Sequence, residues 1–260
     1  MTIKILTLFP EMFTGILTNS IIKRAIASKI VTIKIIDIRS FTKDKHGRVD
    51  SAPVGGGAGL IMKCQPIIDA LEDAKKGSTA KTILLSPRGK TYDQKMARGL
   101  ANAKQDIILI CGHYEGTDER INNYVDELVS IGDYILTGGE IGAMAITDSI
   151  VRLLDGAISK DSIVEESFEN LLLEYPQYAE PYDFNKDKIP DILYSGNHLA
   201  IKKWRRKESL RLTRKYRKDL FNKVELTKVD KALLEELDKD VKHPEWEVKA
   251  IEKGHKFIKK

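Results

Sequence analysis

The first 158 residues alternate short apolar runs rich in β-branched residues with stretches whose apolar residues recur at helical spacing. This alternation predicts a parallel sheet covered by helices on both faces. The expected strands are Ile3–Leu8, Val31–Asp37, Thr82–Ser86, Ile107–Cys111 and Glu127–Ile131, and the expected helices are Pro66–Ala74, Asp93–Ala103 and Glu140–Leu154. Ligands of such sheets bind in loops at the carboxyl ends of the strands, so chemistry is expected there.

The pattern changes beyond about residue 158. Residues 159–167 are polar without clear periodicity, which is typical of a linker. Residues 168–260 begin with a proline-containing loop and then become helical. The helices expected there are Leu199–Lys215, Lys228–Asp240 and Pro244–Phe257. The sequence therefore predicts an α/β domain over residues 1–158 and a smaller, mostly helical second domain.

Composition excludes several classes of protein. Hydrophobic residues make up 42% and charged residues 31%, as in ordinary globular proteins, and no apolar run reaches the roughly 18 residues of a membrane span. The start, MTIKILTLFPEMF, lacks the features of a secretory signal. Apolar neighbours of Cys64 and Cys111 predict reduced, buried thiols, and five scattered histidines predict no metal site. We expect a cytoplasmic protein without membrane contact.

Basic residues are concentrated in one segment. The net charge is only +5, but ten Lys or Arg residues and one acid, Glu208, lie between His198 and Lys218. Such a run predicts a phosphate-binding surface. A solvated helix face is the alternative. Trp204 and Tyr216 lie among the charges, and the other acids lie in other segments, which favours the phosphate-binding interpretation.

Three glycine-bearing loops are candidates for ligand binding, although each is also compatible with simple tight turns. The loop Gly55–Gly59 is not a nucleotide-triphosphate loop, because no Gly-Lys-Ser/Thr follows it. The loop Cys111–Gly116 comes straight off an expected strand and carries an aromatic and a carboxylate between glycines. The loop Ser130–Glu140 leads into an apolar helix. The residues alone predict an α/β ligand-binding domain with a basic helical appendage.

A series of motifs in one order carries a resemblance over about 80% of the chain. They are Leu8-Phe9-Pro10-Glu11-Met12-Phe13, His46, Val49-Asp50, Gly55 to Gly59, Leu85-Ser86-Pro87, Tyr114-Glu115-Gly116, Asp118-Glu119-Arg120, Ser130 to Glu140 and Ser195-Gly196-Asn197-His198. With these motifs the sequence resembles the bacterial tRNA (guanine-N1)-methyltransferase family, of the trefoil-knotted SPOUT class.

The resemblance implies a knotted α/β domain, a linker over 159–167 and a helical domain over 168–260 that binds tRNA. It also implies a homodimer whose active sites are shared between subunits. S-adenosyl-L-methionine is expected in the knot, between three loops. The residues expected to bind it are Leu85, Ser86, Pro87, Gly89, Gly112, Tyr114, Glu115, Ser130, Ile131, Gly132, Asp133, Tyr134, Ile135, Leu136, Gly138 and Gly139. The implied substrate is the guanosine 3′ of the anticodon, position 37, preceded by another guanosine.

Methylation of guanine N1 needs a base near N1 and a cation near O6, where negative charge develops as the proton leaves. The resemblance implies Glu166 as the base and Arg152 as its partner. The family more often carries Asp-Ser-Phe where this chain has Glu166-Ser167-Phe168, so Glu165 is the alternative base. A solvated linker acid at Glu166 and an ordinary ion pair at Arg152 are the alternatives without function.

Contacts with tRNA are implied for a further set of residues. They are Glu115, Glu174, Ser195, Asn197, His198, Lys202 and Arg205. The chain departs from the family at Ala179-Glu180-Pro181, where Thr-Arg-Pro is common, and at Asp50-Ser51 and Val54, where paired aspartates and a tyrosine are common. These departures concern tRNA contacts rather than the reaction. Dependence on Mg²⁺ is left open by the sequence.

Two other functions compete with tRNA methylation. One is a related methyltransferase acting on another RNA, such as ribosomal RNA, which would share the cofactor loops. The other is a non-enzymatic RNA-binding protein, which would show damage in the Ser130–Gly139 loop. A nucleotide hydrolase is rejected, because the chain lacks the required lysine and magnesium ligands.

Overall fold

The computed structural model describes residues 1–77, 79–159, 163 and 165–254, and the chain divides into two compact units, Met1–Ile163 and Val164–Lys260. The expected linker at 159–167 spans this division. Residues 160–162 and 164 of that linker lie outside the described residues, as does the expected helix end at Phe257. Each unit is described by itself below.

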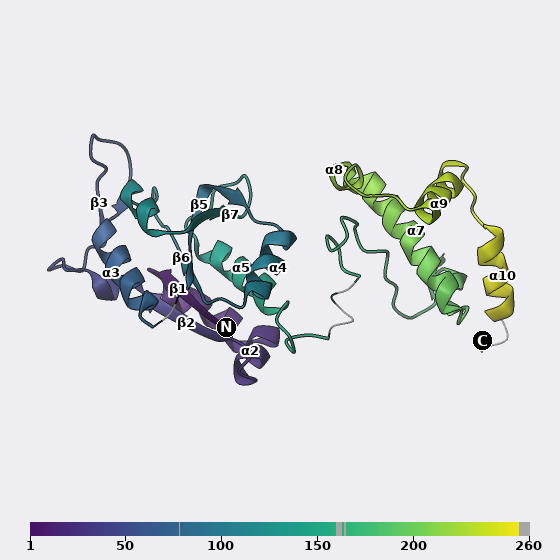
Figure 1. The fold of residues 1–260 in the computed structure, drawn as a ribbon, viewed down its shortest axis with the longest axis horizontal. Coiled ribbons are helices and arrows are strands. Elements are labelled where there is room, and N and C mark those ends of the chain that lie inside the picture. Colours follow the sequence, from purple (N-terminus) through teal and green to yellow (C-terminus); the bar gives the residue numbers. More distant parts are fainter. Residues whose placement is uncertain (78, 160–162, 164, 255–260) are drawn as a thin grey trace. The chain divides into compact units, whose positions relative to one another are not determined.

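The first unit contains a five-stranded parallel sheet (Figure 1). Its strands are β1 (Thr2–Thr7), β2 (Thr32–Asp37), β5 (Lys81–Thr91), β6 (Ile107–Ile110) and β7 (Glu127–Ser130), in the order β2-β1-β6-β5-β7. The parallel α/β fold expected from the sequence is therefore confirmed. The trefoil knot stays a prediction.

Helices cover both faces of the sheet, and each face has its own core. Apolar residues of β1 alternate between the two: Ile3 and Ile5 pack with the helices α2 (Ser20–Ala27), α4 (Gln94–Ala103) and α5 (Glu140–Val151). Leu6 packs on the other face with α3 (Cys64–Lys75). All four residues of β6 are buried, as expected for a central strand of a parallel sheet. Figure 1 shows α3 on one side of the sheet and α4 and α5 on the other.

Strand β5 differs from its expected range, Thr82–Ser86, because the chain leaves the sheet and returns to it. Leu85 and Lys90 both pair with Val129 of β7, so residues 86–89 loop out between them. Gly89 allows the return, since a Cβ there would lie 2.3 Å from the backbone nitrogen of Val129. This loop contains Ser86.

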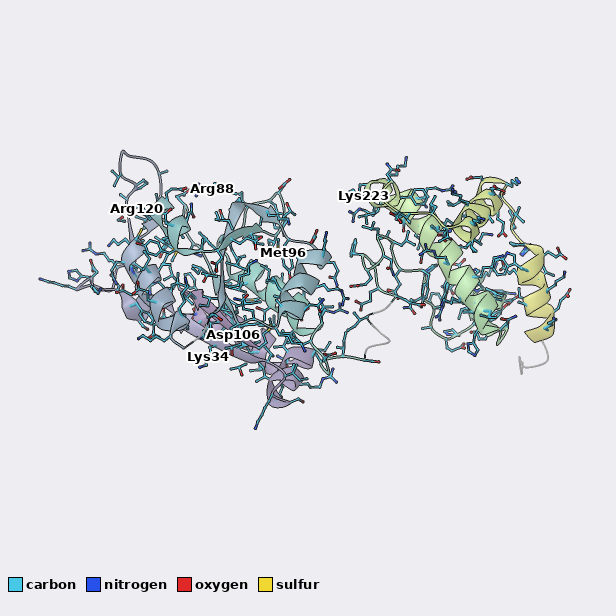
Figure 2. All side chains as sticks on the ribbon, in the orientation of Figure 1. Lys34, Arg88, Met96, Asp106, Arg120 and Lys223 are labelled. Atoms are coloured by element: carbon cyan, nitrogen blue, oxygen red, sulfur yellow. The ribbon has the colours of Figure 1, made fainter. Side chains whose placement is uncertain are left out.

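Short elements that the sequence pattern did not indicate complete the first unit. They are α1 (Thr14–Thr18), α2, the antiparallel pair β3 (Asp50–Ser51) and β4 (Ile61–Met62), and the 3₁₀ helices η1 (Pro10–Phe13), η2 (Ile38–Phe41) and η3 (Glu119–Tyr124). Asp106, just before β6, accepts a hydrogen bond from the backbone nitrogen of Thr2 at 2.7 Å, which joins two neighbouring strands (Figure 2).

The second unit is mostly helical, as expected. Its elements are the hairpin β8 (Asp183–Phe184) and β9 (Asp187–Lys188), η4 (Asp191–Tyr194), α7 (His198–Tyr216), α8 (Lys218–Phe221), α9 (Lys228–Asp238) and α10 (Glu245–Gly254). Leu210 of α7 packs with Leu233 and Leu234 of α9. Trp204 is buried in a second small core with Ile192 and Ala250. Trp204 therefore adds to this core rather than to the surface of the basic segment.

Cys111 is fully buried and Cys64 half-buried, and both are free thiols. Burial raises the pKa of the Cys111 thiol well above its ordinary value. None of the helices in the described residues is long and apolar enough to cross a membrane.

Candidate active site

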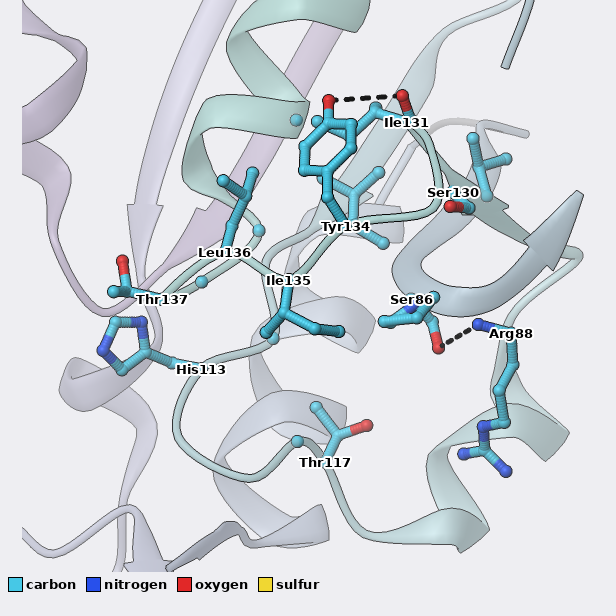
Figure 3. Close-up of a pocket in the computed structure, with 18 of the residues that line it drawn as sticks. Ser86, Arg88, His113, Thr117, Ser130, Ile131, Tyr134, Ile135, Leu136 and Thr137 are labelled. Carbon is cyan, nitrogen blue, oxygen red and sulfur yellow. Dashed lines mark hydrogen bonds between the residues drawn. The ribbon is translucent and has the colours of Figure 1, made fainter. Parts of the chain in front are cut away.

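A cavity of about 550 Å³ lies in the first unit, where three adjacent strands end. Loops following the first part of β5, β6 and β7 form its walls, and Figure 3 shows Ser86, His113 and Ile135 of these loops around it. Carboxyl ends of parallel strands are where open α/β sheets bind ligands. The volume falls in the range of small-molecule pockets.

The residues expected to bind the cofactor gather around this cavity, except for Gly89 and Asp133, which do not line it. Gly89 instead lets the β5 backbone approach β7. Several lining residues were not expected from the sequence, namely Arg88, His113, Gly116, Thr117, Val129, Thr137 and Gly142. Most of these adjoin expected residues in the chain. Gly142 lies within α5, and only the packing of that helix against Leu85 and Ile131 brings it to the cavity.

Backbone contacts hold the loop after β6 against the loop before α5. The backbone nitrogen of Gly139 donates to the carbonyl of Gly112 at 2.7 Å, and His113 forms a bridge with Gly138. Tyr114 adopts a left-handed conformation, with φ of 60°, which is uncommon for a residue with a side chain. The loop thus has a fixed and slightly strained shape that projects Tyr114 and Glu115 to the cavity.

The loop after β7 is closed on itself by side-chain hydrogen bonds. The Ser130 hydroxyl donates to the carbonyl of Gly132 and accepts from its backbone nitrogen, and the Tyr134 hydroxyl donates to the carbonyl of Ile131 at 3.3 Å (Figure 3). Ile135 follows with 81% of its surface exposed, although it is a large apolar residue. The loop therefore combines internal order with an apolar outer surface.

Arg88 lines the cavity, and further charged residues lie at the start of η3. Arg88 forms an ion pair with Glu119 at 2.7 Å, and Arg120 forms one with Asp118 at 2.7 Å. Figure 2 labels Arg88 and Arg120 on the same side of the unit. The Arg120 guanidinium holds the pKa of Asp118 well below its usual range. The ion pair of Arg88 joins the loop that leaves β5 to η3.

The second unit contains a cavity of its own, of about 610 Å³. Its lining combines aromatic, basic and acidic residues, among them Glu165, Tyr175, Tyr194, His198, Lys202 and Arg205. The Arg205 guanidinium stacks over the Tyr175 ring at 4.6 Å, and the Tyr175 hydroxyl donates to Glu165 at 3.0 Å. Burial raises the pKa of Tyr175, and the hydrogen bond to Glu165 raises it further.

Most basic residues of α7 are engaged in ion pairs inside the second unit. The pairs are Lys203–Glu236, Arg205–Glu165, Arg206–Asp230, Lys207–Glu236, Arg211–Glu208 and Arg214–Asp238. Arg217, the residue after α7, pairs with Asp219. Most of the acids in these pairs come from another segment of the chain, because α9 packs against α7 and supplies Asp230, Glu236 and Asp238. Lys202 is exposed and forms no ion pair within the described part of the chain, so the basic surface is narrower than expected.

The expected catalytic residues lie in different units. Arg152 is the C-cap residue of α5 in the first unit. Glu166 lies at the start of the second unit, and its carbonyl accepts from Glu169. Next to it, the Ser167 hydroxyl accepts from the backbone nitrogen of Glu174 at 2.9 Å.

The Ser195–His198 motif has a local structural role. The Asn197 side chain caps α7 by accepting from the backbone nitrogen of Ala200 at 3.2 Å, and Ser195 is buried beside Gly254. His198, in contrast, is exposed and lines the second cavity.

The parallel sheet and the glycine-lined cavity at its carboxyl edge define an α/β protein with a small-molecule site. Residues 1–223 match the family described as tRNA (guanine-1)-methyltransferase TrmD. The chain belongs to this family, which confirms the resemblance found in the sequence.

Three relatives, each named tRNA (guanine-N(1)-)-methyltransferase, are similar over nearly their whole length. A protein of Clostridium botulinum is 54% identical over 235 residues, which cover 90% of this chain and 98% of the relative. One of Clostridium beijerinckii is 50% identical over 235 residues, with the same coverage. One of Clostridium acetobutylicum is 50% identical over 233 residues, covering 89% of this chain and 96% of the relative.

Proposed function

We propose that this protein transfers a methyl group from S-adenosyl-L-methionine to N1 of the guanosine at position 37 of tRNA, 3′ of the anticodon. The observation that carries the proposal is the cavity formed by the three family loops at the carboxyl edge of the sheet. The substrate also makes the cytoplasm the expected location of the protein.

The lining of the cavity fits the cofactor. Leu85, Ile131 and Leu136 offer apolar surface for a flat ring, and the glycines leave backbone N–H and C=O groups accessible. Gly142 keeps the floor open between Leu85 and Ile131. When bound, S-adenosylmethionine supplies an electrophilic methyl group. The residues we propose to hold it are those expected from the sequence, without Gly89, which acts through the position of its loop, and without Asp133.

The proton on guanine N1 must be removed, and we propose that Glu166 takes it while Arg152 stabilises the negative charge developing on O6. Glu165 is the alternative base; its carboxylate accepts from Tyr175 and lies 3.7 Å from Arg205. Whether Mg²⁺ takes part is a separate question, which removal of the ion by a chelator addresses.

The tRNA is proposed to contact the second unit around its cavity. Lys202, Arg205 and His198 present positive charge and hydrogen-bond donors for phosphates, which position a backbone without reading its sequence. The tyrosines of the cavity offer stacking surfaces for splayed bases. Glu115 and Glu174 remain candidates for contacts with the RNA, whereas Ser195 and Asn197 support such contacts by fixing the start of α7.

A homodimer with shared active sites is part of the proposal. Ile141 and Ala145, one turn apart on α5, are exposed, and they follow the exposed residues Tyr134, Ile135 and Leu136. Contiguous exposed apolar surface marks interaction sites. We propose that a second copy of the chain covers this surface.

The test is methyl transfer from labelled S-adenosylmethionine to unmodified tRNA with consecutive guanosines at positions 36 and 37. Methylation at guanine N1 is expected, and Glu166→Gln is expected to slow it by about 10²- to 10⁴-fold while cofactor binding persists. Glu165→Gln is the matched control and should retain most activity.

Other outcomes would overturn parts of the proposal. Full activity of Glu166→Gln together with loss of methyl transfer in Glu165→Gln would identify Glu165 as the base. Cofactor binding with methylation of ribosomal RNA alone would favour the alternative substrate. Absence of cofactor binding with retained RNA binding would favour a non-enzymatic RNA-binding protein.

A further inference from the structure

A carboxylate is buried immediately behind the wall of the first cavity. Glu140 is the first residue of α5 and is only 2% exposed. Its Oε1 accepts a hydrogen bond from the Thr7 hydroxyl at 2.8 Å, at the carboxyl end of β1. The same hydroxyl accepts from the backbone nitrogen of Phe9 at 3.0 Å, which fixes its direction. Because an unpaired buried carboxylate is strongly destabilising, the donor from Thr7 is needed.

The second oxygen of Glu140 faces the loop that lines the cavity. Oε2 lies 3.7 Å from Nδ1 of His113, and that nitrogen is buried without a hydrogen-bond partner among the described residues. The His113 ring packs against Phe9, with ring centres 4.7 Å apart, and edge-on against Tyr114. At 3.7 Å, Glu140 Oε2 lies slightly beyond hydrogen-bond distance from Nδ1.

The arrangement leaves no room for another side chain. A Cβ on Gly138 would lie 2.3 Å from both Glu140 Oε2 and His113 Nδ1. Gly138 also forms the backbone bridge to His113. The end of β1, the loop after β6 and the loop before α5 thus meet at a single carboxylate, and the last two of these line the cavity (Figure 3).

We propose that Glu140 is a positioning residue for methyl transfer. Held by Thr7, its carboxylate lies 3.7 Å from Nδ1 of His113 and so orients the loop that carries Tyr114 and Glu115 at the cavity. Glu140 acts through His113 and touches neither cofactor nor RNA. The inference rests on the proposed cofactor site and adds a residue to it that resemblance did not assign.

The first test replaces Thr7 by valine, which keeps the shape of the side chain and removes the donor to Glu140. We expect the dissociation constant for S-adenosylmethionine to rise about tenfold, since a buried acceptor loses its partner. Thr147→Val is the matched control. Thr147 is 1% exposed, lies in α5 and has no partner for its hydroxyl among the described residues, so cofactor affinity should be unchanged.

Two further variants keep the proposal falsifiable if Thr7→Val folds poorly. Glu140→Gln can still accept from Thr7 and keeps a polar group beside His113 Nδ1, so it should retain affinity within about threefold of the native protein. His113→Phe keeps an aromatic ring beside Phe9 but removes the donor, and should weaken binding as Thr7→Val does. Calorimetry gives the affinity, and thermal unfolding, measured in parallel, shows whether each variant is folded at the temperature of the assay.

The proposal is overturned if folded Thr7→Val and His113→Phe bind the cofactor as tightly as Thr147→Val does, whatever their thermal stability. A purely structural role for Glu140 predicts that result. Failure of the proposed function is distinguishable, because the native protein itself would then bind no S-adenosylmethionine, and the role of Glu140 in binding it would fall too.

Discussion

Gly89 illustrates how a single residue shapes the site without contacting it. It follows the loop Ser86–Arg88 and pairs the returning strand with β7, where a Cβ would meet the backbone of Val129 at 2.3 Å. A glycine pattern alone cannot distinguish such close approach of two strands from contact with a ligand. The structure explains Gly89 by its approach to Val129, and the expected contact with the cofactor stays a prediction.

Gly89→Ala is expected to lower the free energy of unfolding by about 1–3 kcal/mol, because the added methyl group overpacks the β5–β7 contact. It should also weaken cofactor binding, since Ser86 and Pro87 would shift. Gly99→Ala is the control: Gly99 lies in α4 with open space around it, so alanine should stabilise the helix by up to about 1 kcal/mol. Circular dichroism during urea unfolding measures the free energy of unfolding of each variant. Equal stability of the two variants would contradict the close approach.

At the scale of elements, ion pairs with other segments neutralise much of the positive charge that the sequence of α7 shows. Its basic residues predicted a phosphate-binding surface, but Arg206 binds Asp230 of α9 with two hydrogen bonds of 2.8 and 3.0 Å. Asp230 also completes a capping box with Thr227 at the start of α9. Asp230 thus stabilises both α7 and α9. The spacing of charges within α7 does not predict this contact.

The Arg206–Asp230 pair predicts a pH dependence of stability. Arg206 lowers the pKa of Asp230 to about 2, from an ordinary value of 3.8. Since the folded pKa is the lower one, the stabilisation is present above about pH 4 and is lost as the pH falls towards 2. The difference in pKa corresponds to about 2 kcal/mol.

Asp230→Asn should therefore unfold about 2 kcal/mol more easily at neutral pH, and the difference from the native protein should shrink as the pH approaches 2. Both tryptophans lie in the second unit, so their fluorescence during urea unfolding reports on it. Asp238→Asn removes an exposed ion pair with Arg214 and should cost less than about 1 kcal/mol. If the free energies of unfolding of the native protein and Asp230→Asn differ by the same amount at all pH values, the Arg206–Asp230 pair is not the source of the stabilisation.

At the scale of the whole molecule, the first unit leaves apolar surface beside its cavity. Ile141 is 49% exposed on α5. Ile141→Lys is expected to convert the proposed dimer into monomers and to abolish methyl transfer, because a charge would be buried at the interface. Val229→Lys, on an exposed valine of α9, should leave the dimer intact. Sedimentation velocity distinguishes the two, and a dimeric Ile141→Lys protein would exclude this surface as the interface.

The sequence by itself determined the parallel α/β fold, the helical second unit and the three loops of the cavity, because period-two and helical patterns and strand-ending glycines are local signals. Tertiary structure alone decided that Gly89 faces β7, that Trp204 is buried, and that Asp230 neutralises Arg206. It also decided that Thr7, His113 and Glu140 meet behind the cavity. These contacts join residues separated by 24 to more than 100 positions, and only packing brings such residues together.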